Sequence, residues 1–229
     1  MAKKHSKRYL AALKKYDPQK HYSLSEAVKI LKTFPKGKTD ETVDLSFRLG
    51  VDPKQSDQMV RGTVTLPNGS GKSVKVLVFA KGAAADAAKA AGAEYVGFED
   101  LIKKVSEGFQ DFDVAIATPD AMNEVRKLGK ILGPKGLMPN PKTGTVTTDT
   151  AAAVKACKAG RVEFKLDKSG NVHTYIGKAS FEERALTENA QATIDALSKA
   201  KPASSKGRFI LNCAISTTFS PSIKIALQN

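Results

Sequence analysis

Residues 73–80 read Ser-Val-Lys-Val-Leu-Val-Phe-Ala, a short run in which apolar and β-branched residues predominate. An alanine-rich stretch from Gly82 to Gly92 follows, and then short apolar runs at 94–97 and 112–118 alternate with helix-like stretches at 98–107 and 122–128. This alternation predicts a parallel sheet whose strands are joined by crossover helices. The middle of the chain is therefore predicted to be a small Rossmann-like three-layer domain.

The charge of the chain differs between this middle region and its flanks. The whole chain holds 37 Lys or Arg and 23 Asp or Glu, which gives a formal charge of +14. Residues 68–159 hold 13 basic and 10 acidic residues, so the flanks hold the other 24 and 13. A basic surplus must be solvated or must face an anionic partner, most commonly a nucleic acid. The flanks are therefore the better candidates for such a contact.

The two flanks share a pattern of strands and capped helices. A capping box at Ser23-Leu-Ser-Glu26 predicts a helix through Phe34, and Ser180-Phe-Glu-Glu183 predicts a second helix that ends near Pro202. Strands are expected at 41–51, 60–66, 161–166, 172–176 and 208–215. Neither flank alone can cover a sheet, so together they predict one discontinuous split-βαβ-like layer under two helices.

The chain is thus expected to combine α/β and α+β architecture in two domains. Residues 1–67 and 160–229 would form a discontinuous RNA-binding domain, and 68–159 would be inserted into it. The two chain crossings fall where Pro and Gly accompany the change in composition. We expect them to form a hinge at Pro67, Asn68 and Gly160.

The sequence disfavours catalysis, cofactors and metals. Gly69-Ser-Gly-Lys-Ser73 resembles a phosphate loop, but Leu66 stands where the first glycine is needed and a strand, not a helix, follows. The Rossmann-like region lacks the spaced glycines of a dinucleotide site. None of His5, His21 and His173 is spaced from another His or Cys as metal ligands are, and Cys157 and Cys213 are too far apart in the sequence to form a zinc knuckle. With no apolar run of bilayer length and no secretory signal, a cytosolic protein without a membrane or small-molecule partner is expected.

Three segments each allow two interpretations. The basic stretch 3–20 is either a solvated helix or a phosphate contact, and the net charge favours the contact. The Gly- and Pro-rich segment 131–145 either packs on its own domain or contacts RNA or a partner. The hydroxyl-rich segment 217–222 is either an ordinary strand end or a surface for ribose and phosphate.

Several separated strings together carry a family resemblance. They are Asp40-Glu-Thr-Val43, Asp57-Gln-Met-Val-Arg-Gly-Thr-Val64, Leu132-Gly-Pro-Lys-Gly-Leu-Met-Pro-Asn-Pro-Lys142, Val172-His173 with Gly177-Lys-Ala-Ser-Phe181, and Thr217 to Ser222. In this order they closely resemble the bacterial-type family of the large-subunit ribosomal protein numbered one, over nearly the whole chain. The resemblance implies a cytoplasmic constituent of the large ribosomal subunit that binds large-subunit ribosomal RNA and forms the mobile stalk. It further implies help in releasing exit-site tRNA and, in some members, repression of the protein's own mRNA.

The resemblance also implies a set of RNA-binding residues. They are Lys38, Thr39, Thr42, Lys165, Lys168, His173, Thr217, Thr218, Phe219, Ser220 and Ser222. Three of them depart from the family pattern. Phe219 and Ser220 stand where the family often has Met-Gly, and Thr39 stands at a position that is commonly aromatic.

Two rival functions share parts of this pattern. A free-standing RNA-binding translational regulator would have every RNA-binding feature and would differ only in where it resides. A Rossmann-like enzyme or small-molecule binder would use the middle domain, but the missing glycine pattern makes it the weaker rival.

Overall fold

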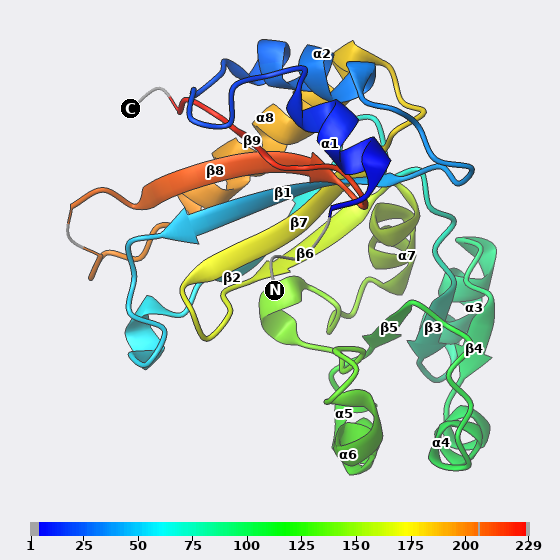
Figure 1. Cartoon of the computed structure of the whole chain (residues 1–229). Helices are drawn as coiled ribbons and strands as arrows, with labels where there is room; N and C mark the ends of the chain where they lie inside the picture. Colours follow the sequence, from blue (N-terminus) through cyan, green and yellow to red (C-terminus); the bar gives the residue numbers. More distant parts are fainter. Residues whose placement is uncertain (1–4, 206, 228–229) are drawn as a thin grey trace. The chain divides into compact units, whose positions relative to one another are not determined.

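A computed structural model describes residues 5–205 and 207–227 (Figure 1). The chain divides into two compact units, Met1–Gly71 with Val162–Asn229, and Lys72–Arg161. We call them the discontinuous unit and the inserted unit. The observed boundaries therefore fall at 71/72 and 161/162, a few residues after the expected boundaries at 67/68 and 159/160. The fold is the expected combination of a mixed α and β layer with a small parallel-sheet domain.

The discontinuous unit is built on an antiparallel sheet of four strands in the order β7-β1-β8-β9. Its helices and strands are α1 (Lys7–Leu13), α2 (Leu24–Thr33), β1 (Thr42–Leu49), η1 (Ser56–Gln58), β2 (Arg61–Thr65), β6 (Arg161–Lys165), β7 (Asn171–Lys178), α8 (Glu183–Lys199), β8 (Ile210–Thr217) and β9 (Ile223–Lys224). Strands β2 and β6 form a separate pair. Figure 1 shows α2 and α8 packed on the same face of the four-stranded sheet.

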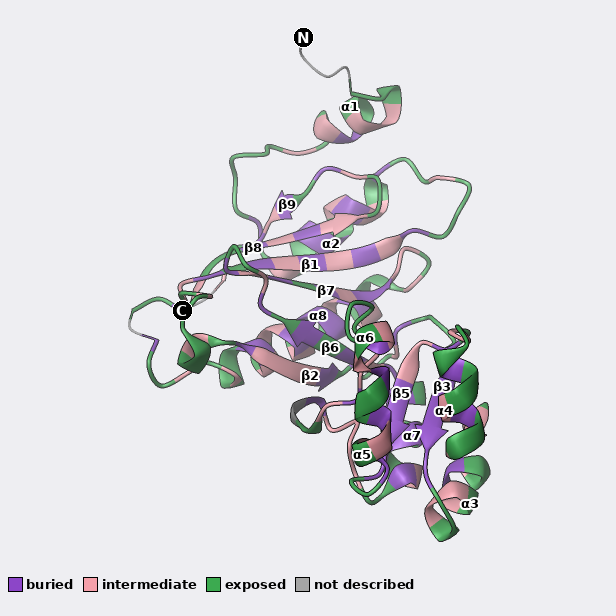
Figure 2. Cartoon of the chain, turned by 90° about the horizontal axis from the view of Figure 1, so that it is seen from below, coloured by how far each residue is buried: buried purple, intermediate pink, exposed green. Residues whose placement is uncertain are grey.

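Alternation along β1 gives this sheet one buried face and one open face. Val43, Leu45, Phe47 and Leu49 are buried, whereas the residues between them are partly or fully exposed, as the colours along β1 show in Figure 2. Strand geometry places successive side chains on opposite faces, so the buried set packs beneath α2 and α8. The other face carries polar side chains.

The inserted unit has three layers. Its sheet is parallel, in the order β4-β3-β5, from β3 (Val76–Phe79), β4 (Tyr95–Gly97) and β5 (Val114–Ala117). Its helices are α3 (Ala83–Ala90), α4 (Glu99–Ser106), α5 (Met122–Val125), η2 (Arg126–Leu128), α6 (Gly129–Leu132), η3 (Pro141–Thr143) and α7 (Thr150–Lys158). Two apolar clusters cover opposite faces of β3, one with α3 and α7 and the other with α4 to α6. This is the predicted Rossmann-like arrangement.

The two expected helix caps had different outcomes. The Ser23 capping box is present, since the Ser23 side chain accepts from the Glu26 backbone and Glu26 from the Ser23 backbone. The capping box predicted at Ser180 was wrong. Helix α8 begins after Glu182 without a side-chain cap, because the Ser180 hydroxyl donates to Asp40 instead (2.7 Å).

Candidate nucleic-acid interface

Most of the predicted RNA-binding residues meet at one end of the four-stranded sheet. Strand β1 begins at Thr42 where the antiparallel strand β8 ends, and Val43 pairs with Thr217. This register places the segment before β1 beside the segment after β8. We call this region the hydroxyl edge; it comprises Lys38, Thr39, Thr42, Thr217, Thr218, Phe219, Ser220 and Ser222.

Backbone and side-chain bonds join the two segments of the hydroxyl edge. The Thr218 N–H donates to the Thr42 carbonyl (3.2 Å), and the Thr42 N–H donates to Thr218 Oγ1 (3.2 Å). A short turn follows, in which the Thr217 N–H donates to Ser220 Oγ (2.9 Å) and the Ser220 N–H donates to the Thr217 carbonyl (3.2 Å). Thr218 and Phe219 therefore project from a fixed turn, and both are exposed.

A buried carboxylate holds this turn from below. Glu41 is 8% exposed, and its Oε2 accepts from the Thr217 hydroxyl (2.6 Å) and the Phe219 N–H (3.3 Å). Its Oε1 lies 3.1 Å from the guanidinium of Arg8 on α1, which also stacks on the Phe219 ring at 5.0 Å. Burial of a charge is tolerated when it is paired and hydrogen-bonded. Glu41 and Arg8 thus fix the turn, and the buried Glu41 carboxylate is not available as an acceptor for RNA.

The open sheet face continues the polar surface from the hydroxyl edge. Lys178 pairs with Thr42 across the strands, and its ammonium donates to Thr42 Oγ1 (3.0 Å). Asp44 follows on the same face, where burial raises its pKa while the nearby His173 and Lys178 pull it down. When it is ionised, the Asp44 carboxylate repels a phosphate that approaches this face.

The other predicted residues lie away from the hydroxyl edge: His173 is part-way along β7, Lys168 is in the turn before β7, and Lys165 ends β6, which pairs with β2. Lys168 belongs to the 167–170 turn, which Asp167 organises by accepting from the Ser169 N–H (2.8 Å) and the Asn171 N–H (2.7 Å). These backbone bonds, first that of Asn171, lower the Asp167 pKa. His173 bonds through Nδ1 to the Ser46 hydroxyl (3.0 Å), and Lys165 and Lys168 are exposed.

The structure does not bring these three residues to the hydroxyl edge. Thr42 pairs with Lys178 at one end of β7, Ser46 pairs with His173 part-way along the strand, and Arg48 pairs with Asn171, next to the Lys168 turn, at the other end. At the rise of an extended strand this separates the ends by about 24 Å. A partner that touches both groups must be an extended surface, such as a folded RNA, and cannot be a small ligand.

The first expected hinge segment is held firmly to α8. Asn189 is fully buried; it accepts from the Asn68 N–H (3.0 Å) and donates to the carbonyls of Gly69 (3.0 Å) and Ile176 (2.7 Å). The Asn68 side chain also donates to Glu188 (2.9 Å) and thereby lowers its pKa. Pro67 is exposed, and Gly160 adopts a φ of 98° that favours glycine.

The two remaining segments of ambiguous interpretation each find contacts within their own unit. In the segment 131–145, Leu137 and Met138 pack against the apolar cluster of the inserted unit, as expected of a loop that covers its own domain. In the basic stretch, residues 3 and 4 lie outside the described residues, and α1 spans only Lys7–Leu13.

Among the described residues, no helix could cross a bilayer and no three His, Cys, Asp or Glu side chains cluster as metal ligands.

Sequence reasoning missed Arg8, Glu41 and Lys178 as parts of the interface. Each acts through a partner distant in the chain, Glu41 with Thr217 and Lys178 with Thr42. Only the strand register brings these pairs together, and nothing in the local sequence reports that register. Glu41 directly precedes β1 and is flanked by Asp40 and Thr42, so no local pattern marks it as a buried acid.

Comparison with known proteins identifies the family. The profile of the ribosomal protein L1p/L10e family matches residues 31–221, most of the chain. The chain belongs to this family. A relative from Lactobacillus delbrueckii subsp. bulgaricus, named large ribosomal subunit protein uL1, is 56% identical over 222 residues, which cover 97% of this chain and 96% of the relative. A relative of the same name from Kosmotoga olearia is 54% identical over 225 residues, covering 98% and 97%.

Family membership decides the broad class of the protein. It is a ribosomal protein, not an enzyme, and its place is the ribosome in the cytoplasm. The matched region 31–221 contains most of the hydroxyl edge and the whole inserted unit. The predicted family, fold class and location are therefore confirmed.

Proposed function

We propose that this protein, as a constituent of the large ribosomal subunit, binds large-subunit ribosomal RNA through the hydroxyl edge and the open sheet face. The observation that carries the proposal is the fixed turn at 217–220, which presents Thr218 and Phe219 beside the Lys38 segment. A rigid donor and acceptor surface suits RNA, whose folded shape and ribose hydroxyls are read by short polar contacts. Exposed lysines at both ends of the sheet would supply salt-sensitive attraction to phosphates.

The proposed role of the bound protein is to form the mobile stalk beside the exit site and to assist release of deacylated tRNA. The inserted unit has a small net charge and is joined to the discontinuous unit by two chain crossings. Motion at the two chain crossings, one at Gly160 and one close after the expected hinge residues Pro67 and Asn68, would let it move while the other unit stays on the RNA. Because Asn68 is tied to α8, the pivot of the first crossing is expected just beyond Gly71.

We further propose that the same surface represses the protein's own mRNA. An RNA site read by shape accepts any RNA that reproduces that shape. A free-standing RNA-binding translational regulator is the alternative function, since the hydroxyl edge would serve it equally. A Rossmann-like small-molecule binder has less support. The Gly69–Ser73 segment is hydrogen-bonded to Asn189 at Gly69 and leads into strand β3, whereas a phosphate loop leads into a helix.

Co-sedimentation separates the ribosomal role from the free-standing one. Tagged protein in cell extracts is fractionated on a sucrose gradient, and the large-subunit and free pools are quantified. Co-migration of most of the protein with large subunits, including after dissociation into separate subunits, supports the proposal. A protein found mainly in the free pool, while still bound to mRNA, would favour the regulator.

A further inference from the structure

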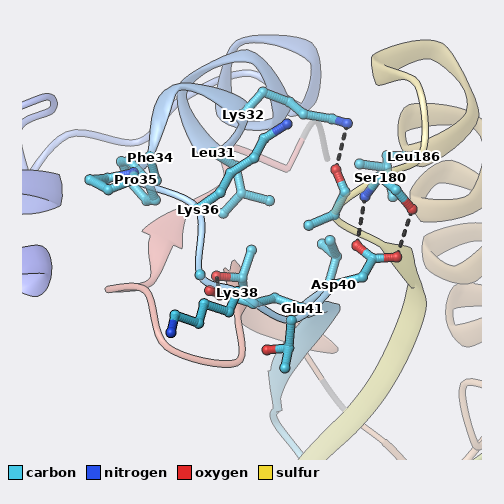
Figure 3. A pocket seen from close by; sticks show the side chains of 15 residues that line it. Leu31, Lys32, Phe34, Pro35, Lys36, Lys38, Asp40, Glu41, Ser180 and Leu186 are labelled. Carbon is cyan, nitrogen blue, oxygen red and sulfur yellow. Dashed lines mark hydrogen bonds between the residues drawn. The ribbon is translucent and has the colours of Figure 1, made fainter.

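A half-open pocket of about 320 Å³ lies directly behind the Lys38 segment of the hydroxyl edge (Figure 3). Leu31 and Phe34 from α2 and its end, Val43 from β1 and Leu186 from α8 give it an apolar floor. All four of these side chains are buried. A volume of this order lies at the lower end for small organic groups, and apolar floors of this kind suit flat rings.

The walls of the pocket are fixed before any ligand arrives. On one side Asp40 accepts from both the Ser180 N–H (3.0 Å) and the Ser180 hydroxyl (2.7 Å). On another, the Lys32 ammonium donates to the carbonyls of Ala179 (2.8 Å) and Phe181. Figure 3 shows the bonds of Asp40 to Ser180 closing one side of the pocket. A preformed site does not need to order these loops when it binds, which favours affinity.

The mouth of the pocket carries the polar groups that are still available. The side chains of Lys36, Lys38 and Thr39 are exposed and make no hydrogen bond or ion pair with another described residue. The same holds for the backbone N–H groups of Gly37, Lys38 and Thr39 within the described chain. A Cβ on Gly37 would come within 2.7 Å of the Arg8 guanidinium, so any other residue at this position would require Arg8 to shift.

We propose that this pocket receives one unstacked nucleobase of the bound RNA. The ring would lie on the apolar floor, its polar edge would meet the free N–H groups of residues 37–39, and the flanking phosphates would meet Lys36 and Lys38. The charge at the mouth is what favours this occupant, since an apolar protein side chain would leave two lysines and three N–H donors unmatched. RNA-binding proteins commonly take up splayed bases in this manner. The inference rests on the proposed RNA-binding function and adds the base to it.

The test fills the pocket with a removable chemical group that is attached to an introduced cysteine in the full-length folded protein. Pro35→Cys places a single exposed thiol on the lining of the pocket, at a position outside the predicted RNA-binding residues, while the native Cys157 and Cys213 are buried and burial raises the pKa of both, that of Cys213 to about 12. The thiol is capped as a mixed disulfide with either a methyl or a benzyl group. The benzyl adduct fills the pocket, the methyl adduct leaves it open, and dithiothreitol restores the starting protein.

Each adduct is titrated with a folded stalk fragment of large-subunit ribosomal RNA, and the bases are probed chemically in each complex. The methyl adduct is expected to bind like the wild type and to protect one unpaired base. The benzyl adduct is expected to bind roughly five- to 150-fold more weakly, as loss of one stacked base does, and to leave that base reactive. Reduction should restore both signals.

Three results would overturn the inference. They are equal binding by the two adducts, weaker binding of the benzyl adduct with no base changing its reactivity, and micromolar saturable binding of a free mononucleotide that leaves RNA affinity untouched. Failure of the proposed RNA-binding function would give a different result. The wild type itself would then bind the stalk fragment no better than an unrelated hairpin.

Discussion

Replacing Thr218 by valine removes one hydroxyl from the hydroxyl edge and keeps the side-chain shape. In the free protein Thr218 Oγ1 accepts only the Thr42 N–H, at 3.2 Å, and its own proton has no acceptor among the described residues. That proton is therefore available to RNA. Loss of the bond to Thr42 is expected to cost about 1 kcal/mol of folding stability.

The effect on RNA binding should be larger than the effect on folding. An RNA acceptor buried against valine is left unpaired, so specific binding should weaken by about 1 to 3 kcal/mol, or roughly five- to 150-fold. No charge changes, so the slope of log K against log salt should stay that of the wild type. Filter binding to the stalk fragment over a salt series measures both quantities, and urea unfolding measures the stability.

Matched variants make this prediction strict. Thr218→Ser keeps the hydroxyl and should retain most of the affinity, whereas Thr148→Val, at an exposed position of the inserted unit, should leave binding unchanged. If Thr218→Val bound the stalk fragment as tightly as the wild type, the hydroxyl edge could not be the surface that reads the RNA.

Other variants address the charges and the buried polar groups. Lys38→Gln and Lys168→Gln should each reduce the salt slope by about 1 in filter binding, since the RNA is expected to span both ends of the sheet; an unchanged slope for Lys168→Gln would confine the contact to the hydroxyl edge. Asn189→Leu should lower the free energy of unfolding, measured in urea, by about 3 kcal/mol, because it leaves three backbone groups without their hydrogen-bond partner. A decrease in this free energy below about 1 kcal/mol would show that water replaces these bonds. The hydrogen bond from Lys72 holds the pKa of Asp113 below its usual range, so the stability it contributes is present above the unfolded pKa near 4 and is lost as pH falls through the folded pKa. The free energy of unfolding of Asp113→Asn should therefore be about 1 kcal/mol lower than that of the wild type at pH 7 and equal to it at low pH. A difference in stability that does not change with pH would contradict a role for the charged Asp113 carboxylate.

Local sequence signals predicted those features of the fold that local bonds decide. The Ser23 capping box formed because both of its partners lie within one helical turn. The matching signal at Ser180 failed because Asp40, 140 residues earlier in the chain, takes the hydroxyl. Helix α7, which the periodicity had not singled out, is positioned by packing of Val154 and Cys157 on the parallel sheet. At Ser180 long-range pairing outcompeted local propensity, whereas α7 also has a local cap, because Asp149 accepts from the Ala152 N–H (3.0 Å).

The candidate site was predicted in its residues but not in its geometry. The resemblance supplied Thr42, Thr217 and Thr218, and the register of β1 with β8 brings them together. It also supplied Lys168, which the same sheet places at its other end. The support from Arg8 and Glu41 depends on an ion pair between helix α1 and the residue just before β1, and the hydrophobic periodicity of a sequence does not reveal such tertiary pairs.

The central claim is that the discontinuous unit reads the shape of large-subunit ribosomal RNA. The most direct test titrates the purified protein against a folded stalk fragment and an unrelated hairpin of equal length over a salt series. We expect binding to the stalk fragment to persist at salt concentrations that abolish the hairpin signal. Equal binding to both RNAs, collapsing together as salt rises, would show that only the basic charge of the protein is at work and would contradict the account.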